Sequence, residues 1–285
     1  MTEDLVIRTQ FITEMIRLNL WYVHQLLTRG AITDRDISSA LTRRVNIYRM
    51  TTLWDGTHDP AYGYHDPAWN RLANQLAKLV CAAPAADTSA LEEEGIALLW
   101  PFLEPRIPLD LGSAPPPPFG CWRYNLAWCC IGDRAGRWRK FLHVTYIAQR
   151  LRLVPSLDAE LHFQNVMKPH SPFDNISCLV SSLQALLADC RRKYPAVRRL
   201  WMHSWLNSLP ACRALFPPSW NQSGFRGPPS NYQSSWGQFV NKAGGFNAKV
   251  AAQFRASGGE FPYIPLVCHA PIEEIEAHLT SLHVC

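Results

Sequence analysis

The segment from Asp174 to Pro195 constrains the fold more than any other, because it shows the start, the apolar spacing and the end of a helix and lies between two strand-like segments. Apolar residues recur at spacings of three and four, at Ile176, Leu179, Val180, Leu183, Leu186 and Leu187. Asp174 can cap the start of this helix, and Pro195 prevents its continuation. Segments with strand character, 158–166 and 199–206, lie on either side. A right-handed crossover through the helix would make these two strands parallel.

The rest of the chain adds helices before this unit and a hairpin next to it. The spacing predicts helices at 3–29, 33–45, 66–80 and 89–103, and a strand at 46–54. A proline-rich stretch, 101–118, follows as a linker. Beyond it we expect a hairpin of strands 121–131 and 138–148, a helix at 209–216 and a loop at 221–235. A mostly helical segment at 235–256, interrupted at Gly244-Gly245, a strand at 261–268 and a final helix from Pro271 follow.

This order of elements predicts an α+β protein with two parts. Residues 1–110 would form a mainly helical N-terminal region. Residues 119–285 would form an α+β domain that carries the functional site, with a mixed, mostly antiparallel sheet flanked by helices.

Charge and composition narrow the classes of function. Lysine and arginine number 28 and aspartate and glutamate 23, which gives a formal charge of only +5 and makes nucleic-acid binding an unfavoured expectation. Because the sequence begins with acidic residues and no apolar core follows, we expect no secretory signal, and no apolar run reaches the roughly 18 residues of a membrane span. The nine cysteines are irregularly spaced, as expected for reduced thiols. These features predict a cytoplasmic protein that acts on a small molecule and does not bind a membrane.

Polar residues gather where the two predicted parallel strands end. Because ligands bind at the carboxyl edge of such strands, we expect a site there. His162 and His203 are the candidate catalytic bases, since an imidazole titrates near neutral pH. The expected substrate-binding residues are Asn165, His170, Ser204, Trp205, Asn207 and Trp236.

Two other interpretations stay open. His58, Asp59 and His65, with Asp66, form two His-Asp pairs that could hold a metal ion, which would make the chain a metal-dependent enzyme. Alternatively, the tryptophan-rich surface and the loop at 221–235 could serve a non-catalytic binding module.

From about residue 120 onward the order of elements resembles the GNAT family of N-acyltransferases. In that fold a strand and the helix after it bracket the pyrophosphate of coenzyme A, and the corresponding segments here are His162–Val166, Met167–Asn175 and the helix that ends at Lys193. The resemblance implies acyl-coenzyme A as the cofactor, with Lys168 and Asn175 near its phosphates and direct transfer of the acyl group to an amine. The family's glycine-containing loop, Q/R-x-x-G-x-G/A, has no counterpart in Met167–Asn175, which contains no glycine.

Overall fold

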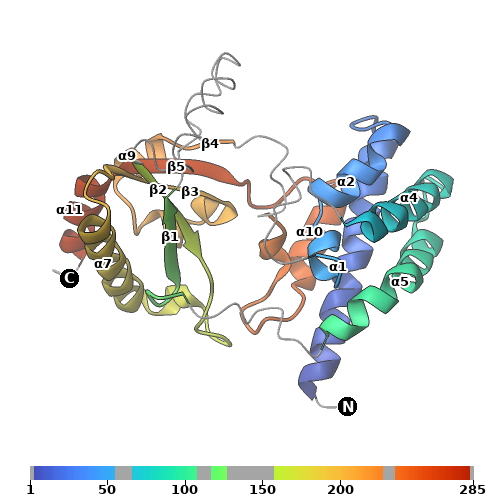
Figure 1. Cartoon of the computed structure of the whole chain (residues 1–285), viewed down its shortest axis with the longest axis horizontal. Coiled ribbons are helices and arrows are strands. Elements are labelled where there is room, and N and C mark those ends of the chain that lie inside the picture. Colours follow the sequence, from blue (N-terminus) through green and yellow to red (C-terminus); the bar gives the residue numbers. More distant parts are fainter. Residues whose placement is uncertain (1–2, 55–65, 108–116, 127–156, 227–234, 283–285) are drawn as a thin grey trace. The chain divides into compact units, whose positions relative to one another are not determined.

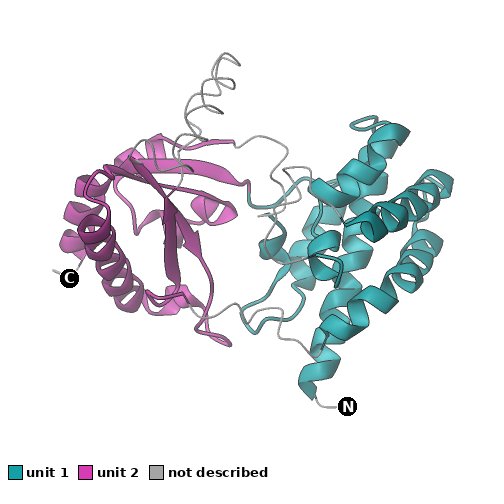
Figure 2. Cartoon of the chain, viewed as in Figure 1, with its two compact units in different colours: residues 1–114, 228–263 teal, residues 115–227, 264–285 magenta. Residues whose placement is uncertain are grey.

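The structure is a computed structural model, and it describes residues 3–54, 66–107, 117–126, 157–226 and 235–282. The chain divides into two compact units (Figure 2). Unit 1 comprises residues 1–114 and 228–263, and unit 2 comprises residues 115–227 and 264–285. The first change of unit falls inside the proline-rich stretch. The sequence-based division differs from this one at 228–263, which belong with the N-terminal helices.

Unit 1 is helical. Its elements are α1 (Glu3–Thr28), η1 (Asp34–Asp36), α2 (Ile37–Arg43), α3 (Ile47–Met50), α4 (Pro67–Ala82), α5 (Ser89–Leu103), η3 (Glu104–Arg106) and α10 (Ala248–Ala256). Asp66 is the N-cap of α4, with Pro67 in the first turn, as predicted. α5 begins one residue after Thr88, whose hydroxyl bonds Glu92, and it runs on through Pro101.

The core of unit 1 depends on close helix packing and on aromatic rings. At Gly95 of α5, an added Cβ would lie 2.4 Å from a methyl carbon of Leu20, so the absence of a side chain lets α5 approach α1. Tyr22 of α1 meets rings from the later segment of the unit, with Trp236 at 5.7 Å and Phe254 at 5.2 Å between centroids. Residues 235–261 therefore complete a core that the N-terminal helices begin.

One prediction for unit 1 is wrong. In place of the strand expected at 46–54, Ile47–Met50 form the short helix α3, and Ile47, Tyr48 and Met50 are all buried, which strict alternation would not allow. The mostly helical segment predicted at 235–256, with its interruption at Gly244-Gly245, is confirmed in outline. Residues 235–239 form a 3₁₀ helix and α10 follows, and Gly244 between them adopts a positive φ of 92°.

Unit 2 is a five-stranded mixed sheet with helices, so the α+β fold class is confirmed (Figure 1). Its elements are β1 (Trp122–Leu126), β2 (Asp158–Phe163), η5 (Pro172–Asp174), α7 (Ile176–Lys193), β3 (Arg199–Ser204), η6 (Trp205–Ser208), α8 (Pro210–Arg213), α9 (Pro218–Gln222), β4 (Phe225–Arg226), β5 (Leu266–Pro271) and α11 (Ile272–Leu282). The sheet order is β1-β2-β3-β5-β4. The predicted hairpin strand at 138–148 lies outside the described residues, and β4 falls in the predicted loop.

The helices α7 and α11 cover one face of this sheet (Figure 1). Leu161, Leu200 and Ala270 contribute to a common core with Leu183 of α7 and Ile275 of α11. Because strand residues alternate between faces, their neighbours in sequence point to the opposite face. We call this second face the polar face, and its members are Arg123, Asn125, Asp158, Glu160, His162, Arg199, Trp201, His203, Val267 and His269.

The predicted parallel arrangement of the strands around α7 is confirmed. β2 and β3 are parallel, and their ladder covers only three positions, from Asp158 opposite Arg199 to Glu160 opposite Trp201. Both strands continue further, because β2 pairs with β1 as far as Phe163 and β3 pairs with β5 as far as Ser204. We call the space between their unpaired carboxyl ends the strand opening.

Candidate functional site

Three histidines lie on the polar face, and two of them flank the strand opening. His162 of β2 and His203 of β3 each stand four residues after the first pair of the parallel ladder, so they occupy equivalent positions on adjacent strands. His269 of β5 lies opposite Trp201 on the same face. The structure therefore places both predicted bases at the carboxyl edge of the parallel pair.

His162 has a defined set of neighbours. Its Nε2 lies 3.0 Å from the amide nitrogen of Asn125, which donates to it, and 3.8 Å from a carboxylate oxygen of Glu160. Burial, together with the positive charge of Arg123, lowers the pKa of His162 to about 4. The ring is therefore neutral at physiological pH, and the lone pair of Nε2 is already engaged.

The other two histidines are also held neutral. Burial lowers the pKa of His203 below its ordinary value of 6.5. Burial lowers the pKa of His269 as well, with Arg199 acting in the same direction and Asp158 opposing it. A neutral imidazole can accept a proton or a hydrogen bond, so His203 meets the first requirement for a general base.

An ion pair between a half-buried arginine and a buried aspartate joins the closed end of the strand opening. Arg199 donates two hydrogen bonds to Asp158, from Nε at 2.8 Å and from Nη2 at 2.9 Å, across the first position of the parallel ladder. Asp158 is only 4% exposed. The two strands are therefore joined at their amino ends and separate beyond Glu160.

In the loop between β2 and α7, the side chains of Asn165 and Asn175 form hydrogen bonds within the loop and with the start of α7. The amide of Asn165 donates to the carbonyl of His170 at 3.2 Å and accepts from the N–H of Met167 at 2.9 Å. The side chain of Asn175 caps α7 by accepting from the N–H of Cys178 at 3.1 Å. Lys168 and His170 are both exposed to solvent.

The cap of α7 is therefore not the predicted one. Asp174 instead closes a capping box with Ser171 around the short helix η5. Ser204, predicted to bind substrate, accepts a hydrogen bond from the N–H of Leu206 at 3.1 Å and caps η6. Trp205 packs against the core of unit 2.

Asn207 is a structural residue in the core, which corrects the prediction that it binds substrate. Its amide nitrogen donates to the carbonyls of Met202 at 2.9 Å and Leu266 at 2.8 Å, and its oxygen accepts from the indole of Trp220 at 3.2 Å. The residue is 2% exposed. Its hydrogen bonds hold the end of β3 against β5, so no donor of this amide is left for a ligand.

Trp236 is also wrongly predicted to line the site. It belongs to unit 1, is 1% exposed, and donates from its indole nitrogen to the carbonyl of Arg44 at 3.0 Å. Its ring is part of the aromatic core of unit 1 and does not wall the strand opening.

The proposed metal ligands His58, Asp59 and His65 lie outside the described residues. Asp66, the fourth member, accepts from the N–H groups of Ala68 and Trp69 as a helix cap. Within the part of the chain that the structure describes, no group of three histidine, cysteine, aspartate or glutamate side chains is arranged to hold a metal ion. Likewise, no described helix has the length and apolar character needed to cross a membrane.

Sequence reasoning missed His269 and the buried pair of Asp158 and Arg199. The signal for His269 is the alternation in Leu266–Pro271, where Cys268 and Ala270 are buried and His269 between them is not. Comparison of the chain with protein-family models, curated proteins and solved structures finds no significant match.

Proposed function

We propose that unit 2 is a small-molecule acyltransferase that binds an acyl thioester, of the acyl-coenzyme A type, in the strand opening and transfers the acyl group directly to an amine. The observation that carries the proposal is the early end of the parallel ladder at Glu160 and Trp201, while both strands continue. Such an opening presents backbone edges to a ligand at the position where parallel strands ordinarily bind one.

The direction of the backbone groups supports an extended ligand that contains amides. The N–H of Gln164 bonds the carbonyl of Cys121 in the segment before β1, so by alternation the carbonyl of Leu161 and the backbone groups of Phe163 face the opening, while the N–H of Leu161 closes the last position of the ladder. The N–H of Ile272 bonds the carbonyl of Arg198, so by the same alternation the backbone groups of His203 face the opening from the other strand. The pantetheine arm of coenzyme A is extended and carries amides, and it can pair with such edges as an added strand does.

His203 is the better candidate for the base, because Nε2 of His162 already accepts from Asn125. His203 accepts the proton that the attacking amine loses as the new amide bond forms and the thioester bond breaks. The thiolate that leaves takes up a proton, so the reaction needs no redox partner. Because the pKa of His203 lies below 6.5, it is in the basic form at neutral pH.

The phosphates require positive groups near the start of α7. The loop at 167–175 has no glycine and Asn175 occupies one of the first N–H groups of the helix, so the side chain of Lys168 is the main charged contact in this proposal. Lys168 is exposed in the loop that leads from β2 to α7.

Binding and transfer are tested separately. Acetyl-coenzyme A at a hundred times its dissociation constant should stabilise the protein by about 2.7 kcal/mol, measured by thermal unfolding. Lys168→Gln should weaken binding of acetyl-coenzyme A but leave binding of acetyl-pantetheine unchanged, with the exposed Lys78→Gln as the matched control. No stabilisation by any acyl-coenzyme A would reject the proposal.

The role of His203 has its own measurement. His203→Ala should retain binding and lower the rate of transfer to a primary amine by about 10²-fold or more. The control is His278→Ala, since His278 is partly exposed and lies on α11, which covers the opposite face of the sheet. Binding without any transfer by the native protein would favour a non-catalytic binding module instead.

A further inference from the structure

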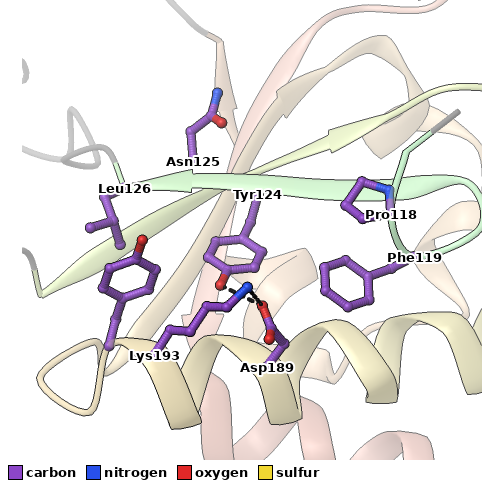
Figure 3. A pocket seen from close by; sticks show the side chains of 8 residues that line it. Pro118, Phe119, Tyr124, Asn125, Leu126, Asp189 and Lys193 are labelled. Atoms are coloured by element: carbon purple, nitrogen blue, oxygen red, sulfur yellow. Dashed lines mark hydrogen bonds and ion pairs between the residues drawn. The ribbon is translucent and has the colours of Figure 1, made fainter. Parts of the chain in front are cut away.

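A hollow of about 450 Å³ lies between β1 and the carboxyl-terminal half of α7 (Figure 3). Its lining residues come from these two elements and the turns beside them: Pro118, Phe119, Tyr124, Asn125, Leu126, Asp189, Lys193 and Tyr194. The ring of Tyr124 points toward α7, away from the polar face. The hollow is therefore separate from the strand opening, and a ligand could occupy it whether or not unit 2 transfers acyl groups.

A hydrogen-bond network forms the polar part of the hollow (Figure 3). The phenol of Tyr124 donates to Asp189 at 3.0 Å, and Nζ of Lys193 lies 2.9 Å from the same oxygen. Arg192 donates to the other oxygen at 2.5 Å. The hydrogen bond from Lys193 lowers the pKa of Asp189, and burial raises the pKa of Tyr124, so the carboxylate is charged and the phenol keeps its proton.

This network determines the charge of a suitable ligand. The carboxylate of Asp189 already accepts three hydrogen bonds, and its charge is opposed by those of Arg192 and Lys193, which leaves one excess positive charge. The side chain of Lys193 is 50% exposed and its ammonium has further N–H groups to donate. A negatively charged group is therefore favoured here, and a positively charged one is not.

Aromatic side chains form the rest of the wall. Tyr124 stacks with Phe119 at 6.3 Å between ring centroids and meets Tyr194 edge-on at 6.2 Å. Tyr194 is 39% exposed and Leu126 is 43% exposed, so a large apolar area at the rim faces water. A planar ring placed against Tyr194 and Leu126 would bury this area and gain the usual aromatic contacts.

We propose that this hollow is a binding site for a small organic anion that carries a planar ring. The anionic group bonds Lys193, and the ring packs against Tyr194 and Leu126. The volume lies within the range of small-molecule sites.

The test uses ligands with the same ring and opposite charge. Isothermal titration calorimetry of the full chain should show binding of indole-3-acetate, at least tenfold weaker binding of tryptamine, and no binding of acetate. Adenosine 5′-monophosphate serves as a second ring-bearing anion and distinguishes a phosphate from a carboxylate. Equal affinity for indole-3-acetate and tryptamine would overturn the proposal, as would no binding of either ring-bearing anion.

Variants assign the binding to this hollow. Tyr194→Ala should weaken binding of the ring-bearing anions about tenfold, because it removes the ring contact. Lys193→Gln should weaken it severalfold while Asp189 keeps Arg192 and Tyr124 as partners. Lys78→Gln, an exposed lysine of unit 1, is the matched control for charge. Circular dichroism confirms that the variants fold, and unchanged affinity in both Tyr194→Ala and Lys193→Gln would overturn the assignment.

Discussion

Unit 1 buries its apolar residues among helices, whereas the sheet of unit 2 has one apolar face against α7 and α11 and one polar face. In unit 1 the buried polar side chains serve the fold, as the indole of Trp69 does by donating to Thr42 at 2.9 Å. In unit 2 three histidines with lowered pKa values share one face of the sheet. Trp69 and Thr42 bond each other within a helical core, whereas the histidines of the polar face are the groups on which the proposed site depends.

The largest expected effect is a loss of stability that affects the core of one unit without affecting the core of the other. Trp69 of α4 and Leu183 of α7 are both fully buried, at 0% exposure. Trp69→Ala should lower the free energy of unfolding of unit 1 by about 4 kcal/mol, and Leu183→Ala that of unit 2 by about 3 kcal/mol, because each leaves a cavity. Calorimetry should show a different transition moving in each variant. A single transition shifted equally by both would mean that the units unfold as one.

A smaller effect is expected from acid. The pKa of His162 is about 4 in the folded state, below the ordinary 6.5, so the unfolded chain binds the proton more tightly. Above pH 6.5 His162 is neutral in both states and does not change the free energy of unfolding. As the pH falls toward 4, proton uptake by the unfolded chain lowers the free energy of unfolding by at most about 3 kcal/mol. His162→Gln should reduce this loss in unit 2, measured by urea unfolding at several pH values. An equal loss in His162→Gln and the native protein would contradict the assignment.

The smallest effect concerns a partly buried charge in unit 1. Burial lowers the pKa of Arg106, whose Nη2 donates to the carbonyl of Arg49 at 3.2 Å and whose Nε has no hydrogen-bond partner among the described residues. Arg106→Met removes a desolvated charge and keeps most of the volume, so the stability of unit 1 should change by less than about 1 kcal/mol. A loss well above that in chemical unfolding would show that the guanidinium is paired with an anion, and unit 1 would then have a charged site of its own.

The sequence predicted best where local signals agreed with packing. For α7, apolar spacing and Pro195 were sufficient to predict Ile176–Lys193, and the parallel strands followed from the handedness of the crossover. His162 and His203 could be placed at the carboxyl edge for the same reason. These features depend on neighbours in sequence and on one topological rule.

Other features depended on contacts between distant segments, which no local pattern contains. Asn207 follows β3 closely in sequence, as a ligand-binding residue would, but Trp220 and Leu266 supply hydrogen-bond partners that make it a core residue. Trp236 belongs to a core begun by Tyr22, more than two hundred residues earlier. The hollow beside Tyr124 likewise forms only when β1 meets the end of α7.

The division of the chain has a consequence for how the protein is made. The backbone passes between the units at residues 114–115, 227–228 and 263–264. As the ribosome releases the polypeptide from its amino end, the helices before residue 110 must wait for Trp236 and Phe254 before their aromatic cluster closes, and β3 must wait for β5. Unit 1 therefore cannot complete its aromatic cluster before Phe254 is translated, and unit 2 cannot complete its sheet before β5 is translated.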